Sequence, residues 1–417
     1  MSEIVIEGGL KLSGEICVQG AKNSVLPVLA ATVLASDECI VHNCPDISDV
    51  ETSLKILASL GCDCFKDGSN VVVNPTQMCR NCIPESLMRE MRSSVVFLGA
   101  ILAKMGEAVI SSPGGCELGP RPIDLHISAL KQLGAQVYEE HGDLRFVAPS
   151  GLKGTQINLS FPSVGATENI ILASATAKGT TVIHNAAKEP EISDLADFLN
   201  SAGARIYGCG SDTVVIHGVD KIFFAEHTII PDRIVAATYM AAVAITGGNL
   251  ILKDASPSHM VSIISVFKDC GCDVSLKGKA IRISAPEKLI RVPTIRTLVH
   301  PGFPTDAGPV IIAMLTKSKG TSVFVENIFE NRFRYIDELK RFGAKIKTEG
   351  RVAVIEGVEH LSAANCQCTD LRGGAALAVA GFAAQGETHL DKIHHIKRGY
   401  EKFVNNFEML GARTKEL

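Results

Sequence analysis

A short motif recurs six times along this chain: an apolar or small residue, then glycine, then alanine or cysteine. The glycines of the six copies are Gly61, Gly134, Gly203, Gly271, Gly343 and Gly411. Successive copies lie 68 to 73 residues apart, a regularity that chance does not produce. A fixed period of this kind indicates one structural unit used repeatedly. The chain is therefore expected to fold as six copies of one unit.

The residues around each glycine predict the same set of elements. Before the first glycine, apolar side chains recur on one face of a helix, as at Val50, Leu54 and Leu57. The glycine is expected to end that helix in the left-handed conformation. Two short strands joined by a turn follow, as in residues 204–216, where glycine and aspartate supply the turn. Another strand, such as residues 181–184, precedes the amphipathic helix.

Each unit also contains a second helix that carries almost no charge. These helices are expected at residues 25–35, 95–103, 170–177, 234–245, 310–315 and 375–384. A helix that is apolar on every side must be buried. The fold class predicted is therefore α/β, with buried helices inside and sheets outside. Three units would form one domain and three the other, related by pseudo-symmetry.

Composition and charge exclude several classes of function. The chain has 41 basic and 45 acidic residues, so no basic surface for nucleic acid is expected. Charge at Glu3 comes too early for a secretory signal. The longest apolar run, residues 234–246, is shorter than the roughly 20 residues that span a bilayer. We expect a cytoplasmic protein with neither nucleic-acid nor membrane partners.

The chain has thirteen cysteines, and their odd number argues against a disulfide framework. Cys62, Cys64, Cys79 and Cys82 could together form a four-thiolate zinc site. The first two lie in a strand-like run, however, where cysteine behaves as a small apolar residue. Small apolar residues are therefore preferred over a zinc site, and neither a metal nor a cofactor is expected.

One cysteine has a different setting. Residues 111–126 contain three glycines and three prolines around Cys116 and Arg121. Such a segment cannot pack as a core, because glycine and proline bury little side chain and proline lacks a backbone donor. It is expected to be a surface loop, with an accessible thiol five residues from a guanidinium group. The thiol is either a reactive group or a free cysteine in a glycine-rich turn.

Polar residues precede the buried helices in a recurring way. Lys22, Arg92, Arg233 and Arg372 each stand near the start of one of them. Helix N-termini carry unpaired N–H groups and partial positive charge, which favour anions. Each residue taken alone can also be a cap or a solvated side chain. Their recurrence at equivalent repeat positions favours a cationic cleft suited to phosphates.

Seven segments carry a resemblance to a known family: residues 20–24, 113–126, 162–167, 301–306, 329–333, 369–372 and 395–401. Along its whole length the chain resembles the UDP-N-acetylglucosamine 1-carboxyvinyltransferases, the enolpyruvyl transferases of peptidoglycan synthesis. The resemblance implies a two-domain inside-out α/β barrel built from six repeats. Residues 22–230 would form the domain with the cysteine loop, and residues 1–21 with 231–417 the second domain. The active site would lie in the cleft between them.

The resemblance also implies a reaction. The 3′-hydroxyl of UDP-N-acetylglucosamine attacks C2 of phosphoenolpyruvate, C3 gains a proton, and phosphate leaves from a tetrahedral intermediate. This needs a base, an acid, and cations on the departing phosphate. Asp306 would be the base. Cys116 would be the acid, the site of a pyruvate adduct and the target of fosfomycin.

The remaining groups are assigned by the same resemblance. Lys22 and Arg398 would act in catalysis, and together with Asn23 and Arg121 they would bind phosphoenolpyruvate. The UDP-sugar would contact Asn23, Arg92, Arg121, Pro122, Ile123, Asp124, Leu125, Ser163, Val164, Asp306 and Ile328. Arg332, Asp370 and Arg372 would support these groups. His395 fits the family motif as a positioning residue, and the family implies a monomer.

The chain departs from the family pattern at two places. Val235 stands where the family usually has an acidic residue, and Ala307-Gly308-Pro309 follows Asp306 in place of longer polar side chains. Both departures affect the expected substrate affinity and not the type of reaction. Two rival functions are a 3-phosphoshikimate enolpyruvyl transferase and a non-catalytic relative that binds the nucleotide sugar.

Overall fold

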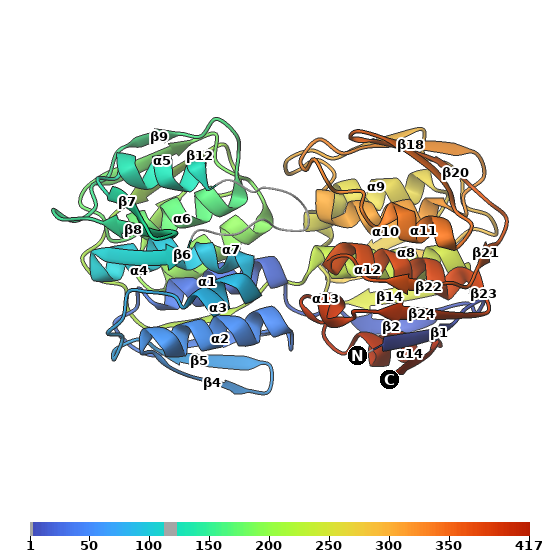
Figure 1. Ribbon diagram of the computed structural model, residues 1–417, viewed down its shortest axis with the longest axis horizontal. Coiled ribbons are helices and arrows are strands. Elements are labelled where there is room, and N and C mark those ends of the chain that lie inside the picture. Colours follow the sequence, from blue (N-terminus) through green and yellow to red (C-terminus); the bar gives the residue numbers. More distant parts are fainter. Residues whose placement is uncertain (1–2, 112–122) are drawn as a thin grey trace. The chain divides into compact units, whose positions relative to one another are not determined.

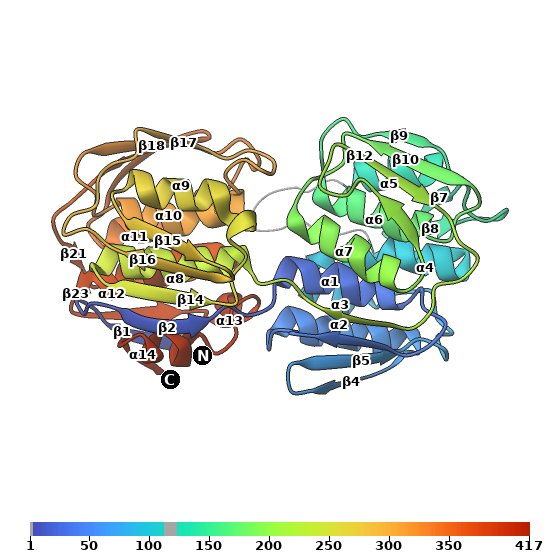
Figure 2. The same cartoon turned by 180° about the vertical axis from the view of Figure 1, so that it is seen from behind.

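The computed structural model of the chain describes residues 3–111 and 123–417, which divide into two compact units (Figures 1 and 2). Unit 1 contains residues 3–19 and Pro231–Leu417. Unit 2 contains residues 20–111 and 123–230. Each unit has its own apolar core of aliphatic and aromatic side chains.

Unit 2 is built from three sheets and three pairs of helices. Its buried helices are α1 (Lys22–Thr32), α4 (Phe97–Met105) and α6 (Val164–Ser174), and its amphipathic helices are α2 (Ser48–Leu60), α5 (Asp124–Gln132) and α7 (Pro190–Ser201). Two short elements, α3 (Glu85–Glu90) and the 3-10 helix η1 (Arg92–Val96), precede α4. The sheets are β13-β3-β5-β4, β6-β8-β7 and β9-β10-β12-β11. Their strands are β3 (Cys39–His42), β4 (Asp63–Asp67), β5 (Asn70–Asn74), β6 (Glu107–Ser111), β7 (Gln136–Glu140), β8 (Asp143–Val147), β9 (Gln156–Asn158), β10 (Thr180–His184), β11 (Arg205–Tyr207), β12 (Thr213–His217) and β13 (Ala225–Thr228).

Unit 1 repeats this plan. Its buried helices are α8 (Arg233–Thr246), α10 (Gly308–Leu315) and α12 (Leu371–Ala383), which contact one another. Its outer helices are α9 (Val261–Asp269), α11 (Ile336–Arg341), α13 (His394–Lys397) and α14 (Phe403–Met409), with 3-10 helices η2 (Pro257–Met260) and η3 (Thr305–Ala307). The main sheets are β22-β24-β1-β25, β15-β16-β14-β2 and β17-β18-β20-β19, beside the strand pair β21-β23. The strands are β1 (Glu3–Glu7), β2 (Ser13–Cys17), β14 (Asn249–Lys253), β15 (Asp273–Lys277), β16 (Ala280–Ser284), β17 (Thr294–Arg296), β18 (Thr321–Val325), β19 (Lys345–Glu349), β20 (Val352–Glu356), β21 (Leu361–Ser362), β22 (Asn365–Gln367), β23 (Ala384–Gln385), β24 (Glu387–Asp391) and β25 (Arg413–Glu416).

The helices with almost no charge lie inside each unit, as the sequence predicts, and the strands lie toward its outside (Figure 1). Every residue of α10 is buried, and so is α8 from Arg233 to Ile245. Strands such as β10 and β20 alternate between buried and more exposed residues. Each of these sheets therefore turns one face to the core and the other to water. Among the helices of residues 3–111 and 123–417, none is long and apolar enough to cross a membrane.

The six repeat glycines all adopt positive φ, between 83° and 101°. This confirms the left-handed caps expected at the helix ends, where a side chain would be strained. Two consecutive strands follow the first five glycines, as expected. The sixth copy differs, because only β25 follows Gly411 and it pairs antiparallel with β1 from the other end of the sequence. The expectation of two consecutive strands was wrong for this copy.

The way the chain passes between units explains this division of the sequence. In three places a buried helix connects two parallel neighbouring strands: β9-α6-β10, β17-α10-β18 and β22-α12-β24. The chain crosses from one unit to the other near residues 19–20 and 230–231. There the two strands that flank a buried helix do not pair with each other. β2 precedes α1 but pairs with β14, which follows α8; β13 precedes α8 but pairs with β3, which follows α1. The N-terminal residues are thus part of the sheets of unit 1.

Candidate functional site

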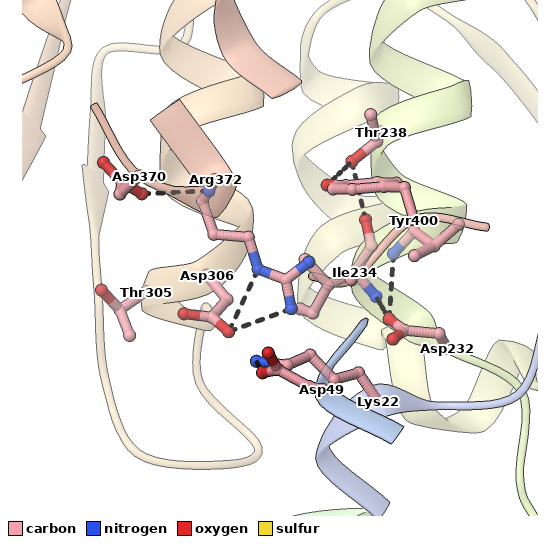
Figure 3. Close-up of polar contacts among 12 residues, drawn as sticks. Lys22, Asp49, Asp232, Ile234, Thr238, Thr305, Asp306, Asp370, Arg372 and Tyr400 are labelled. Atoms are coloured by element: carbon pink, nitrogen blue, oxygen red, sulfur yellow. Dashed lines mark hydrogen bonds and ion pairs between the residues drawn. The ribbon is translucent and has the colours of Figure 1, made fainter. Parts of the chain in front are cut away.

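Two arginines of unit 1 hold the carboxylate of Asp306. Arg372 donates from Nε and Nη2 to Asp306 Oδ2 at 3.3 and 3.2 Å (Figure 3). Arg332 Nη2 donates to Asp306 Oδ1 at 2.9 Å. The arginine side chains are only 3% and 4% exposed, whereas Asp306 is 27% exposed. Adjacent positive charges favour the ionised form of a carboxylate. Asp306 is therefore a hydrogen-bond acceptor whose two carboxylate oxygens each accept from a buried guanidinium group.

The position of Arg372 follows from the start of α12. Asp370 caps this helix, since its Oδ1 accepts hydrogen bonds from the backbone N–H groups of Arg372 and Gly373, each at 3.0 Å. A Cβ at Gly373 would lie 2.7 Å from Asp370 Oδ2, so only glycine allows this close approach. The Arg372 guanidinium also lies over the ring of Tyr400, 5.8 Å from its centroid. Burial lowers the pKa of Arg372, but Asp306, Tyr400 and Asp232 together outweigh it and raise this pKa above its usual value.

Each of the two arginines has one donor that no described residue satisfies. Arg332 Nε and Arg372 Nη1 are buried and have no hydrogen-bond partner among the residues that the structure describes. Buried polar groups are normally paired, and a buried guanidinium group above all. The two free donors therefore favour binding of an anion beside Asp306.

Glu326 fixes the backbone on both sides of this cluster. Its Oε2 accepts from the Thr305 hydroxyl at 2.8 Å, and its Oε1 accepts from the Ile328 N–H at 2.7 Å and from the Thr297 hydroxyl at 2.9 Å. The residue is 1% exposed, and its four hydrogen bonds include one from the Phe329 N–H at 3.1 Å. Sequence reasoning missed Glu326, although an acidic residue directly after a buried strand was a signal.

Gln19 plays a similar part beside Arg398, which follows α13. The amide of Gln19 donates to the carbonyl oxygen of Gly399 at 3.2 Å and accepts from the N–H of Glu401 at 3.0 Å. Gln19 thus fixes the backbone directly after Arg398. The residues lie about 380 positions apart in the sequence, and no local pattern connects them.

A hollow of about 360 Å³ lies beside this segment of unit 1. Its lining includes Thr369 and His395, the neighbours of Asp370 and of the Arg398 segment. His395 therefore lines this hollow together with Thr369, and its positioning role stays a prediction.

In unit 2, Lys22 is the first residue of α1, and its Nζ lies 2.9 Å from Asp49 Oδ2 (Figure 3). Both side chains are largely buried. A cation at a helix N-terminus is opposed by the helix dipole, so it needs a nearby anion. Asp49 supplies that charge in the described structure, and sequence reasoning did not find it.

The other site residues predicted in unit 2 begin three helical segments. Arg92 starts η1, Ser163 caps α6 by accepting from the Ala166 N–H at 3.3 Å, and Val164 follows it. Ile123 precedes α5, whose first residues are Asp124 and Leu125. Asn23 follows Lys22 in α1. Cys116, Arg121 and Pro122 lie outside the described residues.

The two departures from the family pattern are packed into the core. Val235 is fully buried in α8. A Cβ at Gly308 would lie 2.8 Å from the Phe324 ring, and Pro309 occupies the first turn of α10. Small residues after Asp306 therefore leave room for the Phe324 ring.

Within the described ranges, no group of three or more histidine, cysteine or acidic residues is arranged to hold a metal ion. Cys62 is 6% exposed and belongs to the apolar core of unit 2, where burial raises the pKa of its thiol to about 12. This favours the interpretation of Cys62 as a core residue.

Comparison with known proteins gives consistent results. Residues 6–407 match the family model described as EPSP synthase (3-phosphoshikimate 1-carboxyvinyltransferase). The UDP-N-acetylglucosamine 1-carboxyvinyltransferase 2 of Caldanaerobacter subterraneus subsp. tengcongensis is 48% identical over 412 residues, covering 99% of each chain. The UDP-N-acetylglucosamine 1-carboxyvinyltransferase 1 of Symbiobacterium thermophilum is 46% identical, covering 98% of this chain and 93% of that one. The crystal structure of the enolpyruvyl transferase NikO from Streptomyces tendae has the same fold, with a TM-score of 0.90 at 24% identity over 100% of this chain and 98% of that one.

Proposed function

This chain belongs to the enolpyruvyl transferase family, among the UDP-N-acetylglucosamine 1-carboxyvinyltransferases, and we propose that it transfers the enolpyruvyl group of phosphoenolpyruvate to the 3′-hydroxyl of UDP-N-acetylglucosamine. Phosphate is released. The product is a precursor of peptidoglycan, and the transfer is the first committed step of that synthesis.

The observation that carries this proposal is the cluster around Asp306. A substrate with a phosphate and a carboxylate supplies acceptors for the unpaired donors of Arg332 and Arg372. The same cluster offers the Asp306 carboxylate, which is partly exposed, to a hydroxyl group. Positive charge beside a departing phosphate and an acceptor beside an attacking hydroxyl are what this transfer needs.

Asp306 is the proposed base, and its surroundings limit how it acts. An ionised carboxylate between two guanidinium groups accepts a hydrogen bond but removes a proton poorly. We propose that Asp306 first orients the 3′-hydroxyl and takes its proton as the bond from oxygen to C2 forms, because the hydroxyl becomes acidic only then. Cys116 donates a proton to C3, which gives the tetrahedral intermediate with a methyl group at C3. This methyl group then returns a proton to the Cys116 thiolate, and the C2–C3 double bond is restored as phosphate leaves with the electrons of its bond to C2.

Substrate binding uses residues of both units in this proposal. Lys22, Asn23, Arg121 and Arg398 hold phosphoenolpyruvate. The residues at the starts of η1, α5 and α6 hold the nucleotide sugar, together with Asp306 and Ile328. The six repeats form an inside-out α/β barrel of two domains, and the enzyme acts as a monomer in the cytoplasm.

The test is product formation by the purified protein. With phosphoenolpyruvate and UDP-N-acetylglucosamine together, mass spectrometry is expected to find the enolpyruvyl ether of the sugar nucleotide and an equal amount of phosphate. Tight binding of the nucleotide sugar with no turnover would instead identify a non-catalytic relative.

A further inference from the structure

Asn169 lies at the point where three segments of unit 2 meet. The two N–H groups of its Nδ2 are shared among three acceptors: the carbonyl oxygen of Val95 at 3.1 Å, that of Gly165 at 3.3 Å, and His126 Nδ1 at 3.1 Å. Its Oδ1 accepts from the Gly99 N–H at 2.7 Å. The side chain is completely buried. One amide group thus joins η1 and the start of α4 to the first turn of α6 and to α5.

These segments are the ones on which the candidate nucleotide-sugar contacts begin. Val95 belongs to η1, whose first residue is Arg92. Gly165 follows Val164 in the first turn of α6. His126 is in the first turn of α5, directly after Leu125. Asn169 is not itself one of the candidate nucleotide-sugar contacts. Any influence that it has on the ligand therefore acts through the positions of the three segments.

The hydrogen-bonding pattern leaves one assignment for the amide. Three acceptors face Nδ2 and one donor faces Oδ1, so the amide cannot be reversed without placing oxygen against oxygen. The bond to Asn169 requires a lone pair on His126 Nδ1, so the ring proton is on Nε2. Burial lowers the pKa of His126 to about 4, partly offset by Asp124, which keeps the ring neutral at neutral pH.

The packing around Asn169 is too close for the segments to shift freely. A Cβ at Gly99 would lie 2.4 Å from the Asn169 carbonyl oxygen. A Cβ at Gly165 would lie 3.1 Å from the His126 ring. Glycine at both positions allows the two helices and the histidine to approach the amide closely.

We propose that Asn169 is a positioning residue for the nucleotide-sugar side of the site. Its amide holds the starts of η1, α5 and α6 in one arrangement, and that arrangement sets the affinity for UDP-N-acetylglucosamine. The proposal rests on the proposed function, since it concerns the same substrate.

The experiment compares binding of UDP-N-acetylglucosamine to the wild type and to Asn169→Asp by calorimetry. The aspartate keeps the acceptor for Gly99 but places a carboxylate against two carbonyl oxygens. We expect the dissociation constant to rise about tenfold or more, because buried polar groups lose their partners. Ser174→Ala is the matched control: Ser174 is buried in the same helix, and within the described part of the chain its hydroxyl has no partner.

Two further readouts separate positioning from general destabilisation. The KM for UDP-N-acetylglucosamine should rise in Asn169→Asp, while the KM for phosphoenolpyruvate changes less than about twofold. The ¹⁵N resonance of His126 Nδ1, which reports the unprotonated nitrogen in the wild type, should move. If Asn169→Asp does not fold, binding of UDP-N-acetylglucosamine is measured with His126→Leu, which removes only the link to α5. His126→Asn is its control, because it offers an acceptor at the same place and should bind the nucleotide sugar like the wild type.

Unchanged binding by Asn169→Asp, or by His126→Leu in its place, would overturn the inference alone. An equal rise in both KM values would do the same, because it would indicate general loss of structure. If the wild type itself does not bind UDP-N-acetylglucosamine, the proposed function fails and this inference fails with it.

Discussion

At the scale of single residues, the surroundings of Asp306 determine its chemistry. Two buried guanidinium groups contact its carboxylate, and this pairing lowers its strength as a base. The sequence predicted Asp306 as a base and the arginines as supporting groups, but it did not predict that the arginines contact the base directly. That relation depends on side chains from η3, residue 332 and α12, which come together only in the folded chain.

Replacing Asp306 with asparagine should lower kcat by about 100-fold or more, the range for removal of a general base. The amide still accepts a hydrogen bond but cannot take the proton. Steady-state kinetics checks this, with Asp337→Asn as a control, because Asp337 is in the same unit and forms an exposed ion pair with Lys340. A kcat within about threefold of the wild type would exclude Asp306 as the base.

Replacing Cys116 with serine should remove most turnover, because an alcohol is a far weaker acid and nucleophile than a thiol. Fosfomycin should alkylate Cys116, and peptide mass spectrometry would locate the adduct. Burial raises the pKa of Cys62 and Cys368 to about 12, so these thiols should not react. An adduct found only on other cysteines would contradict the assignment.

His126 should make stability depend on pH. Burial lowers its folded pKa to about 4 from 6.5, so between these values the unfolded chain binds more protons and stability falls as the pH is lowered. The shift corresponds to about 3 kcal/mol. Urea unfolding at pH 7 and pH 4 should show that His126→Asn loses less stability on acidification than the wild type. An equal loss in both proteins would show that His126 is not held neutral.

At the scale of elements, the starts of the buried helices carry the candidate groups. Lys22 begins α1, Val164 begins α6, and Arg372 lies in the first turn of α12. The sequence predicted these positions because charge stops where an apolar helix begins. It could not predict Asp49 or Gln19, since their partners lie in other elements and no motif marks them.

The contribution of the α12 cap to stability can be tested separately from the catalytic activity. Asp370→Ala removes the acceptor for two backbone N–H groups and should cost about 1 kcal/mol. For a unit of this size that corresponds to a fall in Tm of about 2–4 °C. Asp370→Asn keeps the acceptor and should melt close to the wild type. Equal melting of both variants would show that the cap does not stabilise α12.

At the scale of the whole molecule, the repeat spacing predicted the buried helices, the outer sheets and five of the six strand pairs. The sixth pair is absent for a topological reason: β25 pairs with β1 from the start of the chain and not with a strand that follows it in the sequence. The exchange of β2 and β13 was also not predictable, because strand pairing across 236 and 186 residues leaves no local pattern.

The family of the chain contains enzymes for two acceptors, and the choice between them is the central claim. The most direct test supplies phosphoenolpyruvate with equal concentrations of UDP-N-acetylglucosamine and shikimate 3-phosphate, and identifies the enolpyruvyl products by mass spectrometry. We predict an enolpyruvyl product on UDP-N-acetylglucosamine only, formed together with phosphate. Product on shikimate 3-phosphate alone would contradict the account.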